Sequence, residues 1–151
     1  CTCVVASAAQ PRTTYAQEPF FRAAALVAAR GSFELHLNGQ VRGAYLTSVT
    51  RESGNFRVKS TFALAGMDMR EEHDVLLNAA LRPLAHGVKQ TAQGVSYVTD
   101  VKVSQDRASG TAQNPGPAGI ATSNIDIAIP DRTIDDEAVP VLLATLELAD
   151  G

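Results

Sequence analysis

The segment Asn55-Phe-Arg-Val-Lys-Ser-Thr-Phe-Ala-Leu64 alternates between two kinds of side chain. One parity holds Phe56, Val58, Ser60, Phe62 and Leu64, and the other holds Asn55, Arg57, Lys59 and Thr61. Successive side chains of a β-strand point to opposite faces, so this pattern predicts a strand with one buried and one wet face. The same alternation recurs from Gly31 to Val103 and predicts an antiparallel sheet around this strand.

Turn residues divide the region into strands. Asn38-Gly39 indicates a tight hairpin. A two-residue loop would pair Leu37 with Gln40 and bring polar groups onto the apolar face, so we expect a three-residue loop with a bulge. The expected strands are 32–37, 41–49, 55–64, 67–77, 84–93, 95–103 and 125–129, with a short strand at 110–113, a loop at 78–83 and an exposed loop at 114–119.

Two helices are expected beside the sheet. Pro19–Arg30 is alanine-rich, begins with a proline suited to a first helical turn and is followed by Gly31. Thr133-Ile-Asp-Asp136 has the spacing of a capping box, and apolar residues recur at helical spacing from Val139 to Leu146. The fold class is therefore α+β, mainly β: a curved antiparallel sheet of about seven or eight strands, with a short N-terminal helix and a C-terminal helix packed on it.

The bulk composition restricts the class of protein. The chain has 151 residues, 45% of them hydrophobic and 19% charged, as in one globular domain. Its formal net charge is -3 and its 13 Lys and Arg residues form no run, which argues against a nucleic-acid partner. Because no apolar run approaches the roughly 20 residues that a bilayer requires, we expect no transmembrane segment.

The beginning of the chain indicates export. Residues 1–9 are apolar and end in small residues, with a small-x-small cleavage pattern at Ala6-Ser7-Ala8. We interpret them as the remnant of a signal peptide and expect a periplasmic protein. The alternative makes Cys1 the lipidated first residue of an outer-membrane lipoprotein. Residues 10–18 are expected to be a linker and 19–151 a single β-rich domain, truncated at its C-terminal end.

No motif predicts catalysis, a metal or a cofactor. Glu71 and His73 share one face of their strand, whereas Glu72 and Asp74 share the other, so this acidic group offers at most a two-residue half-site. Asp135 and Asp136 are explained by helix capping. A hydrolase or metal-dependent enzyme drawing on Glu71, His73 and Asp100 is the third of three functional hypotheses.

The apolar face is the main candidate site. It allows two interpretations: a hydrophobic core covered by the helices, or a face left partly open as a ligand pocket, for which methionines would be adaptable lining. The candidate ligand-binding residues on it are Phe33, Leu35, Tyr45, Phe56, Val58, Phe62, Leu64, Met67, Met69, Tyr97 and Val101.

Three stretches carry a family resemblance: Gly31–Gly43 with its G-x-F-x-L-x-x-N-G-x-x-x-G pattern, Leu81-Arg82-Pro83, and the segment from Thr133 to Gly151. Together with the order of elements, they resemble uncharacterised bacterial periplasmic families related to the LolA/LolB lipoprotein carriers. The resemblance implies a sheet curled into an open half-barrel, whose concave side is covered by helices and can hold acyl chains.

The first hypothesis is therefore an exported, non-enzymatic protein that binds a lipid or another apolar molecule on the concave face. The second is an envelope structural or assembly module that uses exposed strand edges to contact a protein partner and holds no small ligand.

Overall fold

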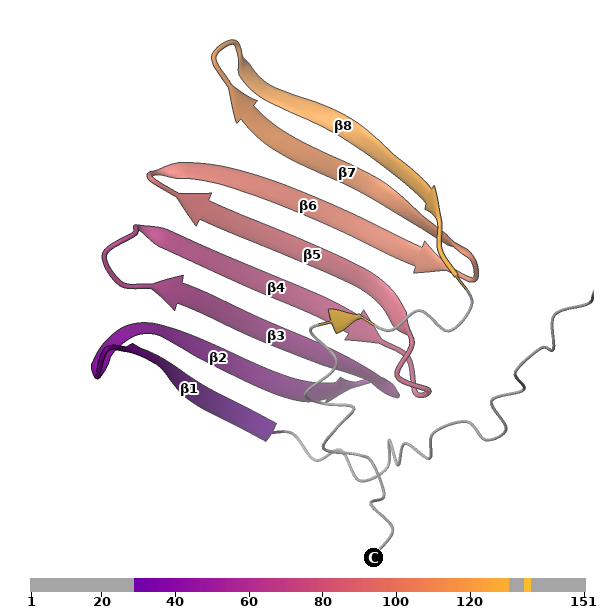
Figure 1. Ribbon diagram of the computed structural model, residues 1–151. Coiled ribbons are helices and arrows are strands. Elements are labelled where there is room, and N and C mark those ends of the chain that lie inside the picture. The colour runs from indigo at the N-terminus through magenta and orange to yellow at the C-terminus, as the bar shows by residue number, and fades with distance from the viewer. Residues whose placement is uncertain (1–28, 131–134, 137–151) are drawn as a thin grey trace, which may run out of the picture.

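The computed structural model describes residues 29–130 and 135–136. One antiparallel sheet of eight strands occupies almost all of this part, and each strand pairs with the next in sequence order (Figure 1). The strands are β1 (Ala29–Leu37), β2 (Gln40–Glu52), β3 (Asn55–Leu64), β4 (Met69–Leu77), β5 (Pro83–Ala92), β6 (Val95–Ser104), β7 (Arg107–Gly116) and β8 (Gly119–Ala128). The mainly-β prediction and the antiparallel sheet are confirmed.

The first hairpin corrects one prediction and confirms another. Leu37 pairs with Gln40, so the loop contains only Asn38 and Gly39, with φ of 53° and 75°, and the predicted three-residue loop is wrong. The bulge exists, but it lies between Leu35 and His36. Because the register shifts there, the strands keep the favoured two-residue turn and still place Leu35 opposite Gly43.

The last hairpin is longer than predicted. The segment 114–119 was expected to be an exposed loop, yet β7 runs to Gly116 and β8 begins at Gly119. Pro115 is tolerated because the pairing of β6 with β7 ends at Val98 and Gln113, so that β7 pairs only with β8 at this point. The short strand predicted at 110–113 is correspondingly a full strand of ten residues.

The predicted helices fall largely outside the described residues, as do the export segment 1–9 and the linker 10–18. Ala29 and Arg30 belong to β1, which corrects the end of the helix expected at 19–30. The described residues 29–130 and 135–136 contain no α-helix. Accordingly, no helix long and apolar enough to cross a membrane occurs among them.

The register aligns side chains in rows across the sheet. One row is almost wholly apolar and joins Val49, Val58, Val75, His86, Val101, Gly110 and Ile125. The next row on the same face is mainly polar or small and joins Thr47, Ser60, His73, Val88, Thr99, Ala112 and Ser123. We call this face, which also carries Phe33, Tyr45 and Tyr97, the apolar face.

The core lies at one end of the central strands on the apolar face. Its buried cluster contains Val49, Phe56, Val58, Val75, Leu77 and Leu81. Leu81 comes from the β4–β5 loop, where its φ is 60°. The loop is held by the Asn78 side chain, whose Oδ1 accepts hydrogen bonds from the backbone N–H groups of Ala80 and Arg82.

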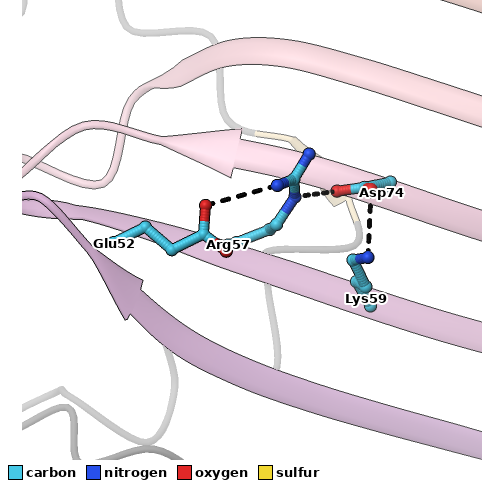
Figure 2. A network of polar contacts seen from close by, with 4 residues as sticks. All are labelled: Glu52, Arg57, Lys59 and Asp74. Carbon is cyan, nitrogen blue, oxygen red and sulfur yellow. Dashed lines mark hydrogen bonds and ion pairs between the residues drawn. The ribbon is translucent and has the colours of Figure 1, made fainter.

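The opposite face is polar and carries an ionic network on β2, β3 and β4 (Figure 2). Arg57 Nε donates to Asp74 Oδ1 at 2.6 Å, and Arg57 Nη1 donates to Glu52 Oε2 at 3.3 Å. Lys59 Nζ lies 3.5 Å from Asp74 Oδ2. The hydrogen bond to Asp74 raises the pKa of Arg57, so this guanidinium stays charged.

Candidate functional site

The apolar face contains all of the predicted ligand-binding residues except Met67. The register connects them directly: Phe33 pairs with Tyr45, Tyr45 with Phe62, and Leu64 with Met69. Met67 lies instead in the β3–β4 turn, where its side chain is exposed, because β4 begins two residues later than predicted. The shared face therefore agrees with the sequence pattern, apart from this residue.

Exposure differs greatly along that face. Phe56 and Val58 are buried in the core, whereas Phe33 is 59% exposed and Tyr97 39% exposed. Phe33 and Tyr45 form a tilted ring pair with centroids 6.1 Å apart. The central end of the face is therefore packed core, whereas Phe33 on the edge strand β1 and Tyr97 on β6 are exposed.

An apolar pocket of about 320 Å³ lies on the same face over β5, β6 and β7. Its apolar lining residues are Pro83, Val88, Val101, Val103, Ala108 and Ile129, and its polar ones are Thr99, His86, Asp135 and Asp136. Ile129 is held there because its N–H donates to the carbonyl of Asp106 at 2.7 Å, in the β6–β7 turn. Of the eleven predicted residues, Val101 contributes to this pocket.

A line of four polar side chains runs from the middle of the sheet to this pocket. Glu71 Oε1 lies 3.1 Å from His73 Nε2, and His73 Nδ1 lies 3.0 Å from His86 Nε2. At the far end, His86 Nδ1 lies 2.8 Å from Asp135 Oδ2. The two imidazole rings are tilted, with centroids 5.3 Å apart. We call these residues the Glu-His-His-Asp line.

The line is partly shielded from solvent. The exposed fraction of the side chain is 13% for His73 and 7% for Asp135. By contrast, the contact of His36 Nε2 with Glu34 Oε2, at 3.0 Å, joins two exposed side chains on β1. Low exposure strengthens electrostatic interactions, so the line is the strongest candidate for chemistry in the described part of the chain.

The hypothetical enzyme site is brought together only in part. Glu71 and His73 are in contact, as their shared parity predicts. Asp100 pairs with Gly87, which pairs with Asp74, so Asp100 belongs to the opposite face of the sheet. Asp100 lies one row away from His73 in the sheet, and adjacent rows point to opposite faces. The side chains of Glu71, His73 and Asp100 therefore do not converge.

Sequence reasoning missed His86, Asp135 and Asp136 as members of one cluster. A usable signal existed for His86, because its pairing with Val75 in an antiparallel hairpin puts it diagonally beside His73. Asp135 and Asp136 gave no such signal, since they follow the last strand and reach His86 only through the tertiary fold.

The polar face has a separate open groove of about 510 Å³ beside the ionic network. Gly87 forms part of its floor, and Arg57, Asp74, Asp100 and Lys102 stand around it. Charges of both signs are present, so the groove favours neither an anion nor a cation.

Comparisons with known proteins identify no relative. No protein-family model matches the chain, and neither a curated protein nor a solved structure shows a match.

Proposed function

We propose that this protein is an exported, non-enzymatic carrier or sensor that binds a lipid acyl chain or a similar apolar molecule on the apolar face of its sheet. The observation that carries the proposal is the pocket of about 320 Å³ with walls made largely of Val, Ala, Ile and Pro side chains. Its volume lies at the lower end of the roughly 300–1,000 Å³ of small-molecule sites, which suits a single chain.

The surroundings of the pocket support an elongated ligand. Tyr97 lies on β6, the strand that also supplies Val101 and Val103, and it is partly exposed on the same face. A chain leaving the pocket along β6 would thus meet further apolar surface. In this proposal the sheet acts as an open half-barrel with its concave side toward the ligand and flanking helices above it, as the resemblance to the periplasmic carriers implies.

A pair of charge substitutions tests this proposal. Val103→Glu places a carboxylate in the pocket, whereas Ile120→Glu places one on the opposite, polar face, where Ile120 is 70% exposed. We expect wild type and Ile120→Glu to bind a dansyl-labelled long-chain fatty acid saturably, and Val103→Glu to bind it at least about tenfold more weakly, because burying an unpaired charge is costly. Circular dichroism checks that both variants fold.

The proposal is wrong if the wild-type protein binds the fatty acid without saturation and solvent extraction of the purified protein yields no lipid. Equal binding by Val103→Glu and Ile120→Glu would also contradict it, because the ligand would then lie elsewhere.

A second candidate, an assembly module that pairs strands with a partner protein, is favoured by the edge strand β8. Its ten residues, Gly119–Ala128, contain Asp126 as their one charged residue and no proline, so the edge lacks the usual protection against strand addition. Edge pairing predicts slower hydrogen exchange of β8 amides in the presence of the partner. Ligand binding in the pocket would instead leave those amides unchanged.

A further inference from the structure

The Glu-His-His-Asp line has more contacts that require a hydrogen than its neutral imidazole rings can supply. Each of its three contacts joins a ring nitrogen to another nitrogen or to a carboxylate oxygen, at 2.8 to 3.1 Å. Each contact needs one hydrogen. Two neutral imidazoles carry only two ring N–H groups, and ionised carboxylates carry none. One contact would therefore bring two lone pairs together, unless the line holds one additional cation.

The additional cation is either a proton, which makes one ring an imidazolium, or a metal ion. If Glu71 accepts from His73 Nε2–H, then His73 Nδ1 is an acceptor and His86 must donate through Nε2–H. His86 Nδ1 is then the unprotonated nitrogen, and it faces the Asp135 carboxylate. This tautomer directs a lone pair of His86 toward the pocket, which is how a metal-binding histidine is prepared.

The Asp135 end of the line has further ligand atoms and the Glu71 end has none among the described residues. His86, Asp135 and Asp136 each offer one atom, and these atoms all lie within 4.8 Å of one another. Bonds from Zn²⁺ to nitrogen and oxygen are about 2.0–2.2 Å and the geometry is tetrahedral, so the ligand atoms of one ion lie about 3.3–3.6 Å apart. Small side-chain rotations would bring the three atoms to that spacing.

We propose that His86, Asp135 and Asp136 bind a divalent transition metal, with Zn²⁺ as the favoured ion, and that His73 and Glu71 are positioning residues for His86. Imidazole nitrogen with two carboxylates suits Zn²⁺ better than Ca²⁺ or Mg²⁺, which prefer oxygen ligands alone. The three protein ligands leave room for water or a ligand group from the adjoining pocket. The inference is independent of the lipid proposal.

Titration of the full chain with Zn²⁺ by calorimetry tests the site. We expect one saturable Zn²⁺ per chain, with little response to Ca²⁺ or Mg²⁺. Asp136→Asn should weaken binding about tenfold or more, and His86→Gln should abolish it. His36→Gln is the matched control, because His36 also contacts a carboxylate but lies on exposed β1, and it should bind as wild type does.

Co²⁺ substitution separates positioning from structural effects. In His73→Gln we expect metal affinity to fall about 10- to 100-fold and the visible Co²⁺ absorption bands to shift, because His86 loses its oriented partner. A merely structural role would lower thermal stability and leave the bands in place. Circular dichroism checks folding of each variant, and Asp136→Asn, which changes an exposed side chain, keeps the test decisive if His86→Gln does not fold.

Absence of saturable Zn²⁺ binding by the wild-type chain would overturn the proposal and leave a shared proton as the cation of the line. Unchanged Zn²⁺ affinity in both His86→Gln and Asp136→Asn would overturn it as well, because the ion would then be bound elsewhere.

Discussion

The centre of the sheet and its last hairpin are built from the same alternating pattern but differ in burial. On β3, Phe56, Val58 and Ser60 are all buried. On β8, Ile125 is half-buried and Ile127 is 56% exposed, although the register places both on the same face as the core. Alternation thus determines which face a side chain occupies, whereas burial depends on what lies beside and above it.

The β4–β5 loop accounts for much of the difference. It adds Leu81 to the cluster formed by Phe56 and Leu77 and so covers the central end of the face. Among the described residues, the β7–β8 hairpin has a strand on one side only, and its Pro117–Ala118 turn adds no residue to that cluster. An apolar row therefore becomes a buried core where a loop packs over it.

The largest expected effect is at the centre. Phe56→Ala should lower the free energy of unfolding by about 3–5 kcal/mol, because it empties a fully buried site. Phe33→Ala, on the exposed edge strand β1, should cost about 1 kcal/mol or less, chiefly the lost ring contact with Tyr45. Urea denaturation of both variants measures the difference. Similar losses would show that the edge is packed as tightly as the centre.

A glycine provides the next comparison, because it marks a place where β6 and β7 approach very closely. A Cβ at Gly110 on β7 would collide with the backbone carbonyl of Asp100 on β6. Gly110→Ala should therefore cost about 1–3 kcal/mol, since backbone must move. In the control Gly87→Ala, the atom nearest to the new Cβ would be the Asp100 carboxylate oxygen, at 3.1 Å, and that side chain can rotate away; the backbone oxygen of Asp74, at 3.8 Å, would be in ordinary van der Waals contact.

Thermal denaturation compares the two glycine variants. If Gly110→Ala were as stable as wild type, β6 and β7 would not be in close contact at this point. A loss in Gly87→Ala larger than that in Gly110→Ala would mean that the Asp100 side chain is fixed.

The sequence was sufficient for the faces of the strands and insufficient for contacts made across them. Glu71 and His73 could be paired from their spacing, because a strand puts residues two apart on one side. The predicted hairpin loop at Asn38-Gly39 failed because the bulge that preserves the facing of Leu35 lies two residues away from the turn. The contact of Asp135 with His86 could not be predicted, because the spacing of residues along the chain does not indicate which part of the sheet is contacted by a segment that follows the last strand.

The smallest expected effects concern two ion pairs, one at the centre and one at the edge. Arg57 and Asp74 join β3 to β4 within a network that includes Glu52 and Lys59. Arg107 and Asp126 join β7 to β8 through two hydrogen bonds to the same carboxylate oxygen, with both side chains more than half exposed. These bonds raise the pKa of Arg107, yet exposure screens the pair so strongly that little stability follows.

Double-mutant cycles with Arg57→Gln and Asp74→Asn should give a coupling of about 0.2–1 kcal/mol, reduced because each side chain is more than one third exposed. The matched cycle with Arg107→Gln and Asp126→Asn should give no measurable coupling. Repeating both in about 1 M NaCl, where the Debye length is about 3 Å, should reduce the central coupling. A central coupling energy that is unchanged by salt would show that Asp74 is shielded by its hydrogen-bond geometry. The difference in coupling energy between the two pairs would then be larger than exposure alone predicts.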